Sequence, residues 1–404
     1  MTTPTRRLFL GSASLAVAGR FHTEAAELPR ELVPAADAIE PYFTAAAKFQ
    51  DVSRGNPVPH RLPETKRQEV GLTRDSWFLE IASDPENPTT LAQSFTREKK
   101  TALDFQTLLK LGETNGVRFA KVMTCLNIGC PLGMGVWEGV PLRDLVWLAK
   151  PSANLRRIFY HGYHNDDPKQ LFRSSLPAGR VLEDYDDLPP VLVCYKLNGH
   201  WLSPERGGPV RIVVPEHYGF KSVKWLHKIT LSNLAAANDT YINGNNDVDS
   251  PLKTFAATLD IPKKIPPNAA FAVTGYAQSG IAGLSKVQVW ISPKDKPWPA
   301  EDPYFTKAPW TDAHILPPPK NWGGDFPEGH SFKGVAGFDD AGQPKTWPLR
   351  LGKAHWAAWI PGLPAGEHVL RCRTIDAKGN AQPMPRPFKK SGRCDIEETA
   401  LVVG

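Results

Sequence analysis

The sequence predicts two folded parts, a mixed α+β domain followed by an all-β sandwich. Over the first part, short strand patterns alternate with short helical patterns, which is typical of a mixed domain. The composition changes near residue 250, and beyond Phe271 short apolar runs are separated by glycine and proline turns. Within residues 286–290 valines alternate with longer side chains, the period-two pattern of a sheet with two unlike faces. We therefore expect one domain over 31–247 and another over 248–404.

The elements of the first domain follow from local patterns. Residues 141–148 begin with proline and carry apolar side chains at the spacing of an amphipathic helix. Residues 30–70 are rich in proline and charge, which favours an irregular arm that wraps the first domain. The remaining patterns predict a helical turn at 104–109 and strands at 77–81, 119–123, 191–197, 211–214 and 227–231.

In the second domain the apolar runs predict strands at 271–276, 286–291, 355–359 and 368–374. Residues 303–348 contain many prolines and glycines, which indicates a long loop.

The bulk composition excludes several classes of protein. The chain has 404 residues, 41% hydrophobic and 22% charged, which excludes a disordered or fibrous protein. The net charge of +6 is small and no tract of lysine and arginine is interleaved with aromatics, so we expect no nucleic-acid partner. The small excess of lysine and arginine favours a local anion-binding site instead.

The N-terminus has the pattern of an export signal. Residues 5–10 read TRRLFL and precede a short run of apolar and small residues, which is typical of a twin-arginine signal. An ordinary secretory signal is the alternative. We expect residues 1–30 to form the signal peptide and the protein to be exported, already folded, to the periplasm. No other segment approaches 18 consecutive apolar residues, so no permanent membrane span is expected.

Cysteine usage draws attention to one thiol. The five cysteines are an odd set without a CxxC pair or a CxxCH haem motif, so we expect neither a disulfide framework nor haem in this chain. Cys125 comes directly after the expected strand at 119–123, in the segment TCLNIGCP (124–131). Such a thiol is either a metal ligand or a buried, inert side chain.

Later segments favour a metal ligand at Cys125. About eighty residues after Cys125 come GPVRIVVP (208–215) and GFKSVKWL (219–226). A lone cysteine followed at this distance by these blocks resembles the molybdenum domain of the sulfite oxidase family. TGYAQSG (274–280), and residues 370–383 with their closing D-x-x-G-N-x-Q-P pattern, resemble the C-terminal immunoglobulin-like dimerisation domain of the same family.

The resemblance implies an α+β molybdopterin-binding domain followed by an immunoglobulin-like sandwich. It implies a mononuclear molybdenum held by a molybdopterin, with Cys125 as the thiolate ligand of the metal. Cys130 is interpreted as structural because the family uses one cysteine ligand.

The resemblance also assigns cofactor contacts. Arg211 occupies the position of the pterin-binding arginine, whose planar fork suits a phosphate. For Lys221 and Lys224 a solvated strand edge is the alternative, and His161 and His164 are interpreted as loop histidines. The residues expected at the cofactor are Asn56, Asn127, Ser174, Arg206, Arg211, Lys221, Ser222 and Lys224.

Two further residues are expected at the reacting centre. Tyr241 lies close to the position of the family's active-site tyrosine with shifted spacing, and packing between domains is its alternative role. Arg54 is a candidate cation for the substrate, and so is Arg393; either can equally be a surface charge.

The sequence departs from sulfite oxidases near the expected metal. There the ligand cysteine is followed by G-N-R-R, whereas here residues 126–129 read LNIG. Arg206 replaces a histidine of the family pattern, and the stretch between Cys125 and Trp137 is short, so a loop that walls the substrate pocket is missing. Fewer cations beside the metal put sulfite itself in doubt.

The resemblance thus implies oxygen-atom transfer on a small molecule, with electrons passed to an external acceptor such as a periplasmic cytochrome, and a homodimer. Two alternatives stay open. One is a reductase of S- or N-oxides on the same fold, and the other is a cofactor-free exported module for binding or assembly.

Overall fold

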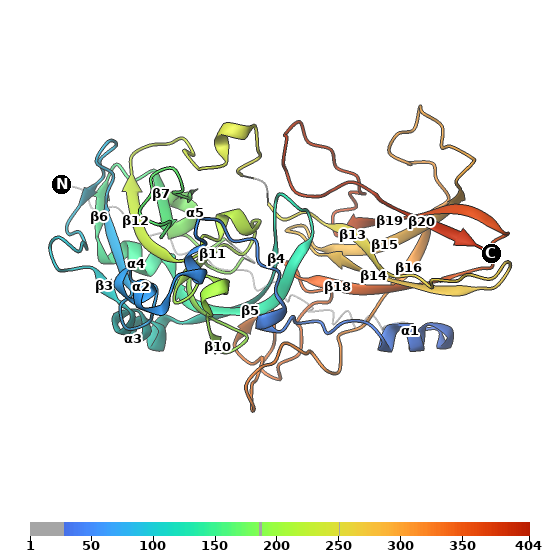
Figure 1. Cartoon of the computed structure of the whole chain (residues 1–404), viewed down its shortest axis with the longest axis horizontal. Helices are drawn as coiled ribbons and strands as arrows, with labels where there is room; N and C mark the ends of the chain where they lie inside the picture. The colour runs from blue at the N-terminus through green and yellow to red at the C-terminus, as the bar shows by residue number, and fades with distance from the viewer. Residues whose placement is uncertain (1–27, 186–187, 250) are drawn as a thin grey trace, which may run out of the picture.

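A computed structural model describes residues 28–185, 188–249 and 251–404. The expected twin-arginine segment lies outside these residues. The chain forms an elongated molecule, with two sheets and most helices at one end and a third sheet at the other (Figure 1). No helix in the described ranges is long and apolar enough to cross a membrane.

The first sheet has five strands in the order β3-β1-β12-β7-β8. β1 and β12 pair in parallel, and the other neighbours are antiparallel. The strands are β1 (Phe78–Ser83), β3 (Leu103–Asp104), β7 (Arg157–Gly162), β8 (Arg173–Pro177) and β12 (Leu226–Ser232).

The second sheet has six strands, in the order β10-β9-β5-β4-β17 with β11 also paired to β9. Its centre is the hairpin of β4 and β5, whose turn carries Cys125. The strands are β4 (Val117–Thr124), β5 (Pro131–Pro141), β9 (Leu192–Leu197), β10 (His200–Trp201), β11 (Arg211–Val213) and β17 (Val335–Ala336).

Short helices pack around these sheets. α3 (Phe105–Asn115) begins where the Asp104 carboxylate accepts a hydrogen bond from the Thr107 backbone N–H at 2.8 Å, which caps the helix. The other helices are α1 (Val33–Asp37), α2 (Glu64–Glu69), α4 (Leu142–Leu148) and α5 (Ala178–Leu182), with 3₁₀ turns η1 to η6 at 30–32, 46–48, 59–61, 204–206, 219–221 and 242–244 and a small sheet of β2 (Thr90–Leu91) and β6 (Pro151–Ala153).

The third sheet is antiparallel throughout, in the order β13-β14-β18-β16-β15-β19-β20. An isolated bridge between Ile265 and Val403 brings its two ends together, so the sheet nearly closes on itself. This confirms the expected all-β sandwich. The strands are β13 (Phe255–Asp260), β14 (Phe271–Gln278), β15 (Leu284–Pro293), β16 (Thr311–Ile315), β18 (Lys353–Ile360), β19 (Gly366–Asp376) and β20 (Glu397–Val403).

The sequence patterns missed β5, the longest strand of the second sheet. Its proline and glycine content argues against a strand on propensity alone. The glycines are needed because neighbours approach closely: a Cβ on Gly139 would lie 2.3 Å from the Val193 carbonyl oxygen. Strands β7, β8, β13 and β20 were also not predicted.

Two segments cross between the halves of the molecule. α1 packs against β14 and β18, far from the first domain's sheets (Figure 1). From the other side, β17 pairs in parallel with β4, although it lies within the stretch 303–348 that was expected to be loop. The boundary at 247/248 stays a prediction, since contacts on both sides of it are exchanged.

Candidate active site

One large cavity opens in the first half of the molecule. Its volume is about 480 Å³. The turn after β4, the segment 49–54, and the loops around 206–211 and 219–225 form its walls. The residues of the expected site that line it are Arg54, Cys125, Asn127, Arg206, Arg211, Ser222, Lys224 and Tyr241.

Cys125 reaches the cavity from a tight turn. The Gly129 N–H donates to the Cys125 carbonyl at 3.1 Å, and Gly129 has a φ of +61°, which side chains adopt rarely. A Cβ there would lie 2.8 Å from the Cβ of Arg393, so the second domain packs directly on this turn. Cys125 is partly exposed, as a metal ligand or a nucleophile must be. Cys130 does not line the cavity, and burial raises the pKa of its thiol.

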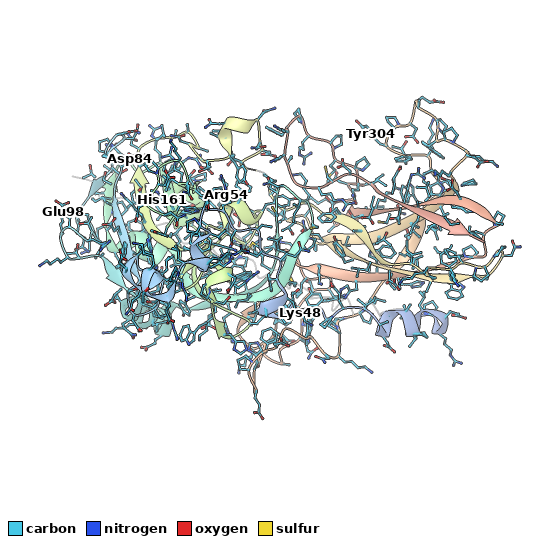
Figure 2. The ribbon with its side chains drawn as sticks, viewed as in Figure 1. Lys48, Arg54, Asp84, Glu98, His161 and Tyr304 are labelled. Carbon is cyan, nitrogen blue, oxygen red and sulfur yellow. The ribbon has the colours of Figure 1, made fainter. Side chains whose placement is uncertain are left out.

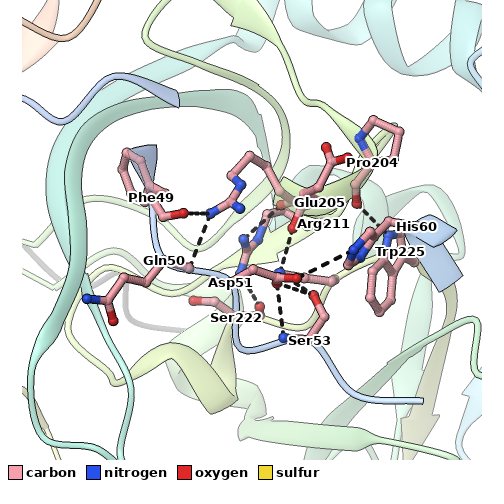
Figure 3. Close-up of polar contacts among 12 residues, drawn as sticks. Phe49, Gln50, Asp51, Ser53, His60, Pro204, Glu205, Arg211, Ser222 and Trp225 are labelled. Atoms are coloured by element: carbon pink, nitrogen blue, oxygen red, sulfur yellow. Dashed lines mark hydrogen bonds and ion pairs between the residues drawn. The ribbon is translucent and has the colours of Figure 1, made fainter. Parts of the chain in front are cut away.

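The guanidinium groups of Arg206 and Arg211 form a cationic wall of the same cavity. Figure 3 labels Arg211 among the residues around it. Arg211 donates to the carbonyls of Arg206 and Ser222, and Arg206 donates to the Phe49 carbonyl at 2.9 Å. These bonds fix both planar groups and use only part of the five N–H donors of each. Burial, the larger effect, and the charge of Arg206 lower the pKa of Arg211 to about 10.

Lys224 completes this wall. Its ammonium donates to Asp51 at 2.9 Å, to the Ser53 hydroxyl at 2.7 Å and to the Glu205 carbonyl at 2.6 Å (Figure 3). Burial first and the charge of Arg211 second lower the pKa of Lys224 to about 8. Two carboxylates, Asp51 and Glu205, therefore lie near three cations, and the excess of positive charge suits a bound anion.

The backbone beneath the cations is built for close approach. Gly207 has a φ of +92°, and a Cβ at this position would lie 2.6 Å from Cγ of Lys224. The Ser222 hydroxyl accepts a hydrogen bond from the Val214 N–H at 3.1 Å, which ties the two loops together.

Near the thiol, the Asn127 side-chain amide donates to the Tyr241 hydroxyl at 3.0 Å. The Tyr241 ring lies between the rings of Phe172 and Phe220, at 5.5 and 5.6 Å. The Arg54 guanidinium lies over the ring of Phe172, 5.2 Å from the ring centroid. Figure 2 places Arg54 within the first half of the molecule. These polar groups share the cavity with apolar walls.

Three expected cofactor residues do not line the cavity. The Lys221 ammonium is fully buried and pairs with Asp239 at 2.7 Å, and the Ser174 hydroxyl donates to the same carboxylate at 2.9 Å. Both side chains are bonded inside the fold, so the alternative of a solvated strand edge is wrong for Lys221. The cofactor contacts of Lys221 and Ser174 stay predictions. Asn56 is exposed, and its backbone N–H donates to Gln170 at 2.7 Å.

Sequence reasoning missed other residues of the cavity. Asp51, the partner of Lys224, and Ser53 lie in the irregular arm, where no periodic pattern singles them out. His164 lines the cavity although it was interpreted as a loop residue. In the described part of the chain, no group of three or more His, Cys, Asp and Glu side chains could hold a metal ion.

Comparison with known proteins supports a molybdopterin cofactor. Residues 68–240 match the family model of the oxidoreductase molybdopterin binding domain. Residues 68–240 thus form a molybdopterin-binding oxidoreductase domain, which supports the resemblance to the sulfite oxidase family. The predicted family, fold class, enzyme class and cofactor are confirmed.

Individual relatives fall within this family. Nitrate reductase [NADPH] of Beauveria bassiana is 28% identical over 55% of this chain and 24% of its own length. That of Fusarium oxysporum is 25% identical over 76% of this chain and 35% of its own length. This chain thus spans about a third or less of these relatives.

A solved structure covers nearly the whole chain. The sulfane dehydrogenase SoxCD from Paracoccus pantotrophus matches with a TM-score of 0.55 and 15% identity, over 96% of this chain and 92% of that chain. At this identity the likeness shows the shared fold, including the sandwich.

The residues present fit a molybdopterin. A phosphate needs fixed N–H donors, which Arg206 and Arg211 present from buried, anchored positions. Because Gly207 has no Cβ, Lys224 packs directly against the loop between the two arginines. Cys125 lines the same cavity and can supply a sulfur ligand to the metal.

Proposed function

We propose that this chain is a periplasmic molybdenum-dependent oxidoreductase that performs oxygen-atom transfer on a small molecule and passes the electrons to an external cytochrome. The observation that carries the proposal is the single cavity that Cys125 lines together with Arg206, Arg211 and Lys224. A thiol and a cluster of cations across one cavity are what a metal held by an anionic pterin requires.

When bound, the cofactor supplies two-electron oxygen-atom transfer chemistry. The chain's residues prepare the site for it. Arg206 and Arg211 hold the anionic part, and Lys224 adds a charge that depends on pH. Asn127 holds the Tyr241 hydroxyl by a hydrogen bond in the cavity that Cys125 also lines, and there the hydroxyl can hold a proton or donate a hydrogen bond to substrate.

Metal analysis tests the proposal. Full-length protein expressed in a host that makes molybdopterin and exports by the twin-arginine route is expected to contain close to one molybdenum per chain in the periplasmic fraction. Less than about a tenth of an atom per chain, or retention in the cytoplasm, would contradict the proposal. Substrate is then sought by reduction of the metal with sulfite and organic sulfur compounds.

A reductase of S- or N-oxides is the second candidate. Two observations favour it: residues 126–129 lack the arginines that follow the ligand cysteine in sulfite oxidases, and the curated relatives named above are nitrate reductases. Oxidation of the dithionite-reduced enzyme by nitrate or by a sulfoxide, without oxidation of sulfite, would select this direction.

Assembly belongs to the same proposal. The sandwich is proposed to form a homodimer, and a separate redox protein is proposed to exchange electrons with the site. Sedimentation of the purified protein tests the dimer. Reduction of an added periplasmic cytochrome c during turnover tests the exchange.

A further inference from the structure

Cations and apolar side chains line the cavity together. Arg206, Arg211 and Lys224 are the cations that the proposed function assigns to the cofactor. The apolar part of the lining is the group around Tyr241, which accepts a hydrogen bond from Asn127 and contacts the rings of Phe172 and Phe220. Its apolar members are Leu126, Ile128, Phe172 and Phe220, and Val52 lines the same cavity between Asp51 and Ser53.

Hydrogen-bond donors are scarce in the apolar part. Asn127 already donates to Tyr241. Among the described residues, Arg54 is held by the Phe172 ring and has no hydrogen bond or ion pair to a protein acceptor. An inorganic oxyanion is normally held by several charged donors at once. This part offers a ligand one guanidinium and the O–H of Tyr241, whose oxygen accepts from Asn127.

Apolar side chains are also exposed at this end. Ile128 is 50% exposed and Val52 is 40% exposed, and they belong to separate segments that border the same cavity. A single exposed apolar residue needs no explanation, but these two border a cavity that the buried rings of Phe172 and Phe220 also line. A ligand with an apolar group would cover it.

From this geometry we infer that the substrate is an organic sulfur or nitrogen compound, with an apolar substituent against Ile128 and Val52 and one anionic or hydrogen-bond-accepting end toward Arg54. Ile128 is the specificity residue, because it stands in the turn where sulfite oxidases carry arginine. The inference rests on the proposed function and goes beyond it by naming the substrate class.

Binding of inert probes tests the inference without turnover. Methanesulfonate, propanesulfonate and pentanesulfonate share one anionic end and differ only in alkyl length. Each fully buried methylene contributes about 0.8 kcal/mol, which is about fourfold in Kd. We expect the Kd to fall at least about tenfold from methanesulfonate to pentanesulfonate. Calorimetry on the molybdenum-loaded protein, with metal content measured on the same sample, gives the result.

Variants locate the effect. Ile128→Ser is expected to remove most of the dependence on alkyl length, and Ile128→Arg to strengthen sulfite binding relative to pentanesulfonate by about tenfold or more. Ile242→Ser is the matched control, since Ile242 is 38% exposed and does not line the cavity. Equal thermal midpoints for the three variants exclude misfolding as the cause.

The outcomes separate the two proposals. Molybdenum-loaded protein whose Kd values for the three sulfonates agree within about twofold would overturn the inference and leave the proposed function standing. Unchanged selectivity in Ile128→Ser and Ile128→Arg would also overturn it. Protein without molybdenum would defeat the proposed function instead.

Discussion

Cys125 and Cys130 stand at the two ends of one turn, yet only Cys125 lines the cavity. We therefore expect Cys125→Ser to lose more than about nine-tenths of its bound molybdenum, because a hydroxyl is a poor soft ligand. Cys130→Ser, the matched control, is expected to keep it. Metal analysis and thermal unfolding of both variants check this. Equal molybdenum content in the two proteins would contradict the assignment of Cys125 as ligand.

Lys224 makes anion binding depend on pH. Its pKa of about 8 means that it is charged at pH 7 and mostly neutral at pH 9. Cofactor-free protein is therefore expected to bind inorganic pyrophosphate up to about tenfold more weakly at pH 9 than at pH 7. Calorimetry measures the affinities.

Lys224→Met is expected to flatten this pH dependence. Lys228→Met is the control, because Lys228 lies on β12 outside the cavity lining. A wild-type affinity that is constant from pH 7 to 9 would show that Lys224 does not contribute its charge.

At the scale of single residues, the motifs predicted which segments reach the cavity, but they did not predict which side chains pair with each other. Arg211 and Lys224 reach the cavity from the segments that the motifs indicated. Lys221 belongs to the same segment, but its charge is consumed by Asp239, which lies 18 residues later. Sequence spacing does not reveal such a pairing, because it depends on how β8 and the loop around Asp239 are packed.

At the scale of elements, β4 contains a fully buried lysine, Lys121. Its ammonium donates to the carbonyls of Val122 and His217 at 3.0 and 2.8 Å. Burial lowers the pKa of Lys121 to about 7, more than the charge of Glu216 raises it. In the unfolded chain its pKa is close to 10.5. Between pH 7 and 10.5 the unfolded state therefore binds more protons, and stability rises with pH.

Lys121→Met is expected to remove this contribution. The free energy of unfolding of the variant relative to wild type should be higher at pH 7 than at pH 10 by roughly 2–3 kcal/mol. Urea denaturation at both pH values measures it. Lys110→Met, an exposed position on α3, is the control. The same difference at both pH values would mean that Lys121 does not titrate in this range.

Elements with a clear period were predictable, and those shaped by crowding were not. α4 was expected from its apolar spacing and is present as Leu142–Leu148. β5 was missed because its glycines are required by close neighbours, which the local sequence does not reveal. A Cβ on Gly133 would lie 2.5 Å from the ring of Phe49. That neighbour comes from the arm, and no local pattern contains it.

At the scale of the whole molecule, the order of domains was predictable from the change in composition, but their interleaving was not. Val335, Phe338, Leu349 and Leu351 belong to the core of the first half although they follow most of the sandwich in sequence. In the opposite direction, Lys353 on β18 pairs with Glu40 of the arm. The turn that holds Cys125 also packs on Arg393. The sandwich thus supports the cavity directly.

A fragment of residues 31–247 is therefore expected not to fold cooperatively, because it lacks the strand and the apolar side chains that complete its core. In the intact chain, Phe338→Ala should destabilise the first half by about 3–5 kcal/mol, since Phe338 is buried against Trp322 and Phe332. Phe388→Ala, at a position 41% exposed, is the matched control. Circular dichroism and urea denaturation follow both. A fragment that unfolds cooperatively and still takes up molybdenum would show that the two halves are independent after all.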